Sequence, residues 1–433
     1  MSDATSETRL PVRAFLWVAW PKLSSGGLQL LTSLLLARAM GPAEFGPLSL
    51  CLAAVLLADA VLGAAVDVGV LKLVTAQGAS GSPYALQIQK AALVGKVTAT
   101  CLIAMPLLLL AGPIGRAFLG NSASRGLIVL SLGALLGLLL LRSVQTHFQS
   151  EGRFALYGIA DALQTVLKFG GIAVLLALHQ ASASGALLFY TAGPLVVAVG
   201  LLATRGRGII AAPLRISSVR TVSEAVKWPI GAGAVGSITS RMDVFLVAAI
   251  AGPVEAGRFS AAQVLVLGFS LIGAYLGVAF APRIMPAWES GRLAEMYVRF
   301  QTTALVACVG IFALCVLLIG PVSSWALPES YQGTAPLVLW LLPSALAAIL
   351  NFPIAFSFLL FVQPRFLFGW DLVAIPALVL MYREGVLSRG ALGAAAVTSI
   401  YALVKTAMVH LQVWRTLQKR RLELADAPCV VTG

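Results

Sequence analysis

The stretch GPAEFGPLS at Gly41–Ser49 nearly recurs 211 residues later as GPVEAGRFS at Gly252–Ser260. Five of the nine positions agree. A glycine followed by a proline is typical of the point where one helix ends and the next begins, because the first helical position does not need the N–H that proline lacks. The repeat therefore predicts two equivalent turns between helices in a chain built from two related halves. A common turn that arose twice is the alternative, and the five matching positions favour duplication.

Each copy contributes four residues to its predicted turn. They are Gly41, Pro42, Glu44 and Gly46 in the first copy, and Gly252, Pro253, Glu255 and Gly257 in the second. We expect the glutamate in the first turn of the second helix, where its charge is favourable to the helix dipole and it can reach back to the cap. The last glycine lets neighbouring backbone approach closely.

The composition is that of a membrane protein. The 433 residues are 59% hydrophobic, with a mean hydropathy of +0.93. Charged residues make up 11%, against about 25% in soluble domains. The apolar residues gather in runs of about 20, the length that spans a bilayer as a helix. Helices are expected because lipid offers the backbone no hydrogen-bond partners.

We predict an all-α polytopic membrane protein with about twelve transmembrane helices in two pseudo-symmetric six-helix bundles. The predicted spans are 13–36, 47–71, 90–113, 126–147, 157–178, 183–204, 224–250, 256–281, 300–320, 334–360, 366–382 and 390–411. The predicted domains are an N-terminus at 1–12, a first bundle at 13–204, a basic linker at 205–223, a second bundle at 224–411 and a tail at 412–433. The two copies of the repeat are six spans apart, so both bundles point the same way across the membrane, as in transporters with parallel repeats.

The basic residues predict the orientation of the chain. Of the 30 Lys and Arg, 18 lie in segments on the same side as the N-terminus, 6 lie in the opposite loops and 6 lie inside spans. Cytoplasmic loops of membrane proteins carry the excess of Lys and Arg. Both termini are therefore expected in the cytoplasm, and the net charge of +13 is explained without nucleic acid.

Two pairs of segments carry a resemblance to a known family. They are LLLARAMGPAEFGPLSLCLAAVLL (34–57) with DVGVLKLVTAQ (67–77), and SRMDVFLVAAIAGPVEAGRFSAAQVLVL (240–267) with AFAPRIMP (279–286). The chain resembles the polysaccharide-type flippases of the multidrug/oligosaccharidyl-lipid/polysaccharide (MOP) exporter superfamily. The resemblance implies a MATE-like, V-shaped pair of bundles around a central cavity. It also implies a bacterial inner-membrane protein that moves a lipid-linked sugar, often on undecaprenyl diphosphate, to the outer leaflet.

Polar residues inside two predicted spans each follow one helix face. The first span carries Lys22, Ser25, Gln29 and Ser33, and the fifth carries Tyr157, Asp161, Gln164 and Lys168. Both sets recur at helical spacing. Ionisable groups in a membrane are energetically costly and face a wet cavity or a partner. The two faces therefore predict a polar interior in the first bundle.

From these groups we predict a cationic cavity. The expected substrate-binding residues are Lys22, Gln29, Lys168 and Arg241, and the residues expected to balance charge or carry a coupling ion are Asp67, Asp161 and Asp243. The planar guanidinium of an arginine can bind the oxygens of a diphosphate in bidentate geometry.

Structural interpretations of the same residues stay open. Lys22, Lys227 and Lys405 could reach an interface with their long side chains. Asp161 with Lys168 could form a structural pair, and Asp243 could serve helix packing. Asp59 and Asp371 favour structural or interfacial roles.

The function predicted from the sequence is a flippase for a lipid-linked oligosaccharide. Its expected partners are that substrate, membrane lipids, a polysaccharide polymerase with chain-length machinery, and a proton or sodium ion for coupling. No cofactor or metal is expected, because the cysteines and histidines show no metal-ligand spacing and no phosphate-binding glycine loop is present. The alternatives are an ion-coupled multidrug antiporter of the same superfamily, a polytopic enzyme acting on lipid-linked sugars, and an assembly protein with a transporter fold.

Overall fold

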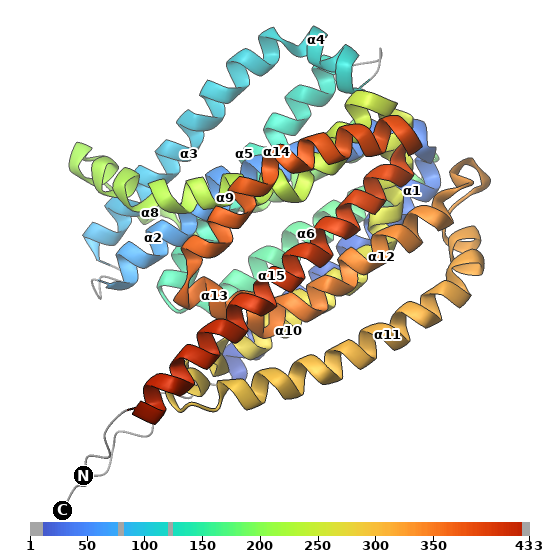
Figure 1. Cartoon of the computed structure of the whole chain (residues 1–433). Helices are drawn as coiled ribbons and strands as arrows, with labels where there is room; N and C mark the ends of the chain where they lie inside the picture. Colours follow the sequence, from blue (N-terminus) through green and yellow to red (C-terminus); the bar gives the residue numbers. More distant parts are fainter. Residues whose placement is uncertain (1–11, 77–81, 120–123, 427–433) are drawn as a thin grey trace, which may run out of the picture. The chain divides into compact units, whose positions relative to one another are not determined.

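The chain is an all-helical membrane protein. The computed structural model describes residues 12–76, 82–119 and 124–426, in which helices follow one another through short connections (Figure 1). Among the described residues, eleven stretches are long and apolar enough to cross a membrane. The first of them, Ser24–Thr75, is 52 residues long and is interrupted at Gly41, so it holds two spans. The prediction of about twelve spans is thereby confirmed.

Two compact units make up the chain, Met1–Ala261 and Ala262–Gly433. The division falls inside the helix Pro253–Glu289. The predicted six-helix bundles, separated by a linker at 205–223, stay a prediction. Within that linker the structure has a short helix, Arg207–Ala211.

The first unit contains nine helices of the described chain and the start of a tenth. They are α1 (Val12–Asp59), α2 (Ala65–Ala76), α3 (Pro83–Leu109), α4 (Ala111–Ile114), α5 (Ser124–Ser150), α6 (Phe154–Ala177), α7 (Ala183–Thr204), α8 (Arg207–Ala211), α9 (Ile216–Ala251) and α10 (Pro253–Glu289). A π-helical turn, Ala60–Ala64, joins α1 to α2, and a second one, Gly115–Leu119, follows α4. Helices α5, α6 and α7 pack against one another, and α1 lies along α6.

Close helix packing in this unit depends on small residues. A Cβ added to Gly137 on α5 would lie 3.0 Å from the backbone nitrogen of Leu195 on α7. A Cβ on Gly193 of α7 would lie 3.0 Å from the carbonyl oxygen of Gln164 on α6. Without a hydrophobic driving force between helices in lipid, such close approach supplies the packing energy. This close packing also places the polar face of α6 next to the neighbouring helices α1 and α7.

The second unit contains the rest of α10 and five further helices. They are α11 (Leu293–Ala326), α12 (Thr334–Leu350), α13 (Ser357–Val362), α14 (Pro364–Arg389) and α15 (Ala391–Asp426). A single 3₁₀ turn, Glu329–Tyr331, precedes α12, and a π-helical turn, Asn351–Phe356, joins α12 to α13. Helix α15 packs against both α12 and α14 (Figure 1).

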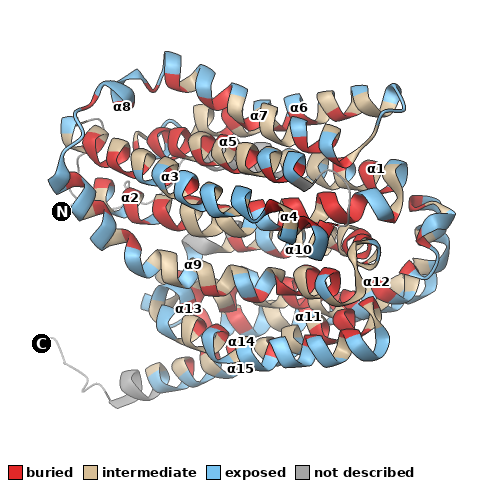
Figure 2. Ribbon diagram, turned by 90° about the horizontal axis from the view of Figure 1, so that it is seen from above, coloured by how far each residue is buried: buried red, intermediate tan, exposed pale blue. Residues whose placement is uncertain are grey.

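Helix α11 is the most exposed long helix of the second unit. Only 6% of its most apolar segment is buried, and most positions along α11 are exposed or intermediate (Figure 2 colours the chain by burial). The exposed side chains include Val306, Val309 and Leu317. A helix with this much apolar exposure is suited to contact lipid.

Candidate functional site

The two polar faces predicted from the sequence meet inside the first unit. Ser25 on α1 donates a hydrogen bond from its Oγ to Asp161 Oδ2 on α6, at 2.8 Å. One turn further along α1 and two turns further along α6, Lys168 Nζ donates to Gln29 Oε1. The periodicity of each helix therefore sets the polar atoms opposite one another, and α1 and α6 are joined by a ladder of polar side chains.

A third helix completes the surroundings of Lys168. Gln29 Nε2 donates to the hydroxyl of Tyr190 on α7 at 2.8 Å. Lys168 Nζ lies 4.7 Å from the centre of the Tyr190 ring, a cation–π distance. The Lys168 side chain is buried, and its hydrogen-bond acceptor is a neutral amide. The ammonium group thus lies against an amide oxygen and a ring face, and the Asp161 carboxylate is the charge that interacts with it.

A second cluster of charges joins α1, α2, α3 and α5. Lys96 Nζ lies 2.5 Å from Asp67 Oδ1 and donates to Ser143 Oγ at 3.0 Å. Arg142 Nε lies 2.7 Å from Asp59 Oδ1. Two positive and two negative charges therefore balance each other in the membrane, where an unpaired charge would be costly. Arg142 is one of the 18 basic residues that the sequence predicts on the cytoplasmic side, and its pairing with Asp59 was not predicted.

Gly63, inside the π-helical turn Ala60–Ala64, leaves room for the Arg142–Asp59 ion pair. A Cβ on Gly63 would lie 2.3 Å from Asp59 Oδ1 and 3.1 Å from Arg142 Cδ. π-Helical turns often occur at functional sites. Here the turn lets a carboxylate and a guanidinium lie against backbone.

A pocket of about 210 Å³ lies beside this cluster. Asp67 and Arg142 reach it from the cluster, and Gln145, Gln149 and Tyr157 add polar groups. Because Arg142 is partly exposed while Asp59 is buried, the guanidinium faces the pocket. The sequence placed Tyr157 on the polar face of α6, and the structure turns that end of the face towards this pocket.

The other predicted site residues are on α1 and α9. Arg241 on α9 is half-buried and makes no ion pair with any described residue. Asp243 is buried, and its Oδ1 accepts a hydrogen bond from the backbone N–H of Val244 at 2.8 Å. The side chain of Lys22 lies outside the described residues.

Both Gly-Pro pairs of the repeat lie at breaks between helices. Gly41 has φ 71° and ψ 170°, and Gly252 has φ 90° and ψ 167°, a conformation that favours glycine in both cases. The glutamates differ. Glu44 accepts the backbone N–H of Ala183 at the start of α7 at 3.2 Å, whereas Glu255 lies 2.7 Å from Arg258. Glu255 lies in the first turn of α10, as expected, and Glu44 contacts a different helix, α7, whose first N–H groups need acceptors.

Valine side chains hold α9 against α2 and α3. Val66 and Val70 on α2 belong to one buried cluster with Val222 and Val226 on α9. A Cβ on Gly69 would lie 2.7 Å from Val226 Cγ1. This contact lies at the start of α9. Beyond the other end of α9, a Cβ on Gly257 of α10 would lie 2.1 Å from the carbonyl oxygen of Pro42 on α1. Helix α9 is therefore joined to the first-half helices near both ends.

The second unit carries structural polar contacts of its own. Asp371 on α14 lies 2.7 Å from Lys405 on α15 and also accepts the hydroxyl of Tyr401. Lys405 thus has an ion-pair partner on the neighbouring helix. Throughout the described ranges, no group of three or more His, Cys, Asp or Glu is arranged to hold a metal ion.

Comparisons with known proteins agree on family and fold. The sequence model of the family described as polysaccharide biosynthesis protein matches residues 12–288. No curated protein matches the chain. The solved structure of the lipid II flippase MurJ in an inward closed conformation is similar with a TM-score of 0.75 and 11% identity, over 94% of this chain and 90% of that one.

Multidrug transporters share the same fold. An outward-facing multidrug resistance MATE family transporter of the MOP superfamily has a TM-score of 0.59 and 13% identity, over 94% of this chain and 96% of that one. A eukaryotic MATE transporter has a TM-score of 0.62 and 13% identity, over 95% and 98%. The fold is thus that of the MOP superfamily, as predicted.

Proposed function

The chain belongs to the polysaccharide biosynthesis protein family, and on that premise we propose that it is a flippase for a lipid-linked oligosaccharide. The lipid carrier would be undecaprenyl diphosphate, and the membrane the bacterial inner membrane, with both termini in the cytoplasm. Transport would proceed by alternating access between the two predicted bundles. It needs no covalent chemistry, since the substrate is the same molecule on both sides.

The observation that carries this proposal is the environment of Lys168. A buried ammonium group hydrogen-bonds to the neutral amide of Gln29 and lies over the ring of Tyr190. A diphosphate would supply the full negative charge that these dipoles only approximate, through charge-assisted hydrogen bonds. An anionic substrate is therefore favoured over a cationic one.

Arg241 adds a second cation for the headgroup. Its half-buried guanidinium makes no ion pair with a carboxylate within the described part of the chain. Guanidinium groups bind phosphate oxygens in bidentate geometry. We assign Lys168 with Gln29 and Arg241 to the headgroup, and we expect Lys22 to contribute from α1. The lipid tail would stay in the bilayer.

Most intramembrane carboxylates already have cationic partners, which weighs against the multidrug antiporter. Asp59 is paired with Arg142, Asp67 with Lys96 and Asp371 with Lys405. A site for cationic drugs needs accessible acidic or aromatic groups. Asp161, which accepts a hydrogen bond from Ser25, is the acidic group best placed for such a role. It would also serve as the group that carries a coupling proton or sodium ion.

Reconstitution tests the proposal directly. The purified protein would be placed in vesicles containing a fluorescent undecaprenyl-diphosphate-linked oligosaccharide, and the fraction accessible to an impermeant quencher would be followed with time. We expect the wild type to equilibrate the lipid between leaflets and Lys168→Met to do so about tenfold more slowly, the loss of one charge-assisted contact. Equal rates with empty vesicles would contradict the proposed function.

A further inference from the structure

A groove of about 770 Å³ lies in the second unit between the end of α10 and the start of α11. Three arginines line it: Arg283 on α10, Arg292 in the connection and Arg299 on α11. Phe280 and Phe300 line the same groove. All three arginines are among the 18 basic residues that the sequence predicts on the cytoplasmic side. Their arrangement around one hollow gives them a further role.

The groove is strongly positive. None of the three arginines forms an ion pair with any residue that the structure describes. Glu295 is the acidic residue among those lining the groove, so the lining carries a net charge of about +2 at neutral pH. Arg292 is also the N-cap of α11, a 34-residue helix whose N-terminal N–H groups and dipole add to the positive potential.

Part of the groove's lining is apolar. Phe280 and Phe300 contact each other edge to face, with ring centroids 5.0 Å apart, and both pack on the buried core of the unit. Met296 lines the groove beside them. Arginines next to aromatic rings are typical of the level where lipid headgroups meet acyl chains. The groove therefore offers one surface to an anion and another to a hydrocarbon chain.

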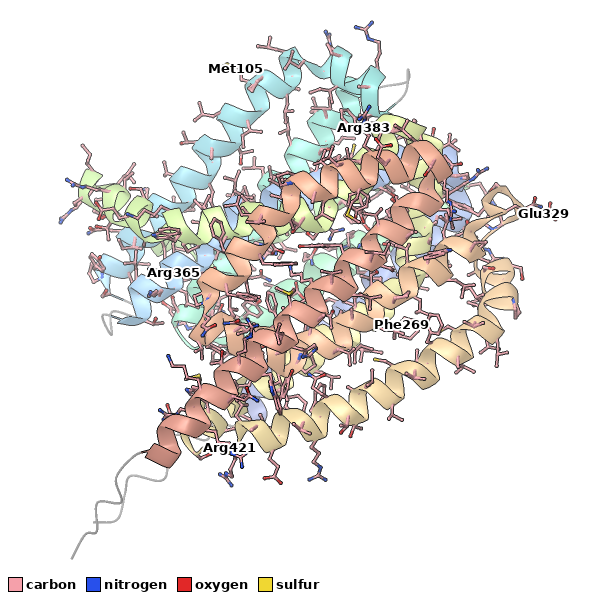
Figure 3. The ribbon with its side chains drawn as sticks, in the orientation of Figure 1. Met105, Phe269, Glu329, Arg365, Arg383 and Arg421 are labelled. Atoms are coloured by element: carbon pink, nitrogen blue, oxygen red, sulfur yellow. The ribbon has the colours of Figure 1, made fainter. Side chains whose placement is uncertain are left out.

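The basic surface continues onto the end of α15. A second hollow of about 360 Å³ shares Arg292 and Glu295 with the groove and adds Arg420 and Arg421. The Arg420 guanidinium lies 5.6 Å from the centre of the Trp288 ring. Figure 3 shows Arg421 beside the start of α11, with Glu329 at the far end of that helix. One end of this unit thus collects arginines on three helices.

We propose that the groove between α10 and α11 binds the diphosphate headgroup of a polyprenyl lipid in the cytoplasmic leaflet. This inference rests on the proposed function, since the lipid is the one to be transported. A diphosphate carries at least two negative charges, which matches the lining, and three guanidinium groups can bind its oxygens. The first prenyl units would lie on Phe280 and Phe300. The groove is a docking site made of different residues from those assigned to translocation.

Photolabelling tests the site by its position. The full-length protein in phosphatidylcholine nanodiscs would be exposed to a photoreactive undecaprenyl diphosphate, and labelled peptides would be mapped by mass spectrometry. We expect the probe to label residues 280–303 of the wild type. In the triple variant Arg283→Gln/Arg292→Gln/Arg299→Gln, labelling of this segment should fall about tenfold. The matched control is Arg205→Gln/Arg207→Gln/Arg215→Gln, which removes the same charge from the linker. Equal labelling of 280–303 in the two triple variants, at equal melting temperature, would overturn the proposal.

Competitors define the ligand. Unlabelled undecaprenyl diphosphate should displace the probe at a concentration at least tenfold below that of inorganic pyrophosphate or cardiolipin. Equal competition by pyrophosphate would assign the groove to a free anion, and equal competition by cardiolipin would make it a general site for anionic lipids. Either result contradicts the proposal. Because labelling does not require transport, a protein that labels in the groove but moves no lipid would contradict only the proposed function.

Discussion

Gly46 and Gly257 lie against each other's repeat in a reciprocal contact. A Cβ on Gly46 would lie 1.9 Å from the carbonyl oxygen of Pro253, and a Cβ on Gly257 would lie 2.1 Å from that of Pro42. The same Cβ atoms would lie 3.2 and 3.0 Å from the backbone nitrogen of the opposite glycine. The two copies of the sequence repeat are therefore packed on each other with local two-fold symmetry, which explains why both keep a glycine at this position.

Alanine at either glycine should destabilise the protein. The added carbon has no space, so backbone must move, and overpacking of this kind costs about 1–3 kcal/mol. We expect Gly46→Ala and Gly257→Ala to lower the melting temperature in detergent by similar amounts, because the contact is reciprocal. Gly27→Ala and Gly236→Ala are the controls, since a Cβ there meets nothing within 4 Å. Melting temperatures of the two contact variants equal to those of the controls would contradict the contact.

Arg241→Ala should reduce transport without unfolding the protein. Its guanidinium makes no ion pair with the described residues, so its removal leaves no charge unpaired. Loss of its contacts to a diphosphate should slow transport about tenfold. Arg241→Lys keeps the positive charge but loses the bidentate guanidinium, so its transport rate should lie between those of the wild type and Arg241→Ala. The measurement is the transport rate per inserted molecule. Wild-type transport by Arg241→Ala at equal abundance would remove Arg241 from the site.

Gln29→Leu should act through Lys168. The substitution removes the acceptor of the lysine and the donor to Tyr190 while keeping a similar volume. We expect transport to fall about as far as in Lys168→Met, and the double variant to be no slower than either single one, because the two residues act as a unit. Lys227→Met, at an exposed position of α9, is the matched control and should transport normally. Additive losses in the double variant would show that Gln29 and Lys168 act separately.

The Lys96–Asp67 pair should behave as a structural pair. Asp67→Asn leaves a buried lysine without its carboxylate and should cost about 3–5 kcal/mol of unfolding free energy, as for other buried pairs broken on one side. The double variant Asp67→Asn/Lys96→Met removes both charges and should recover most of that loss. A double-mutant cycle on melting temperature measures the coupling. No recovery in the double variant would mean that the pair is not the main interaction of either side chain.

The fold could be predicted from the sequence because its signals are local. Apolar runs of bilayer length specify the spans, and the Gly-Pro pairs at Gly41 and Gly252 specify two of the turns. The ends of the helices were predicted less exactly than their number. Helix α10 runs to Glu289 and α11 begins at Leu293, beyond the predicted spans, because these helices continue past their apolar runs with polar turns.

The site could be predicted only in part. Helical spacing identified the polar faces that contain Gln29 and Lys168, but it says nothing of which helices pack together. Tyr190 was missed for that reason, since it is one tyrosine in an apolar helix. The partnership of Lys96 with Asp67 could have been inferred from two opposite charges inside spans, whereas that of Arg142 with Asp59 depends on the π-helical turn.

The most direct test of the account is made in cells depleted of this protein. Lipid-linked sugar intermediates would be quantified by mass spectrometry, their leaflet determined with an impermeant reagent, and susceptibility to cationic drugs measured in the same culture. The account predicts an undecaprenyl-diphosphate-linked oligosaccharide that accumulates in the cytoplasmic leaflet while drug tolerance is unchanged. Absence of any accumulated intermediate, together with new sensitivity to cationic drugs, would contradict it.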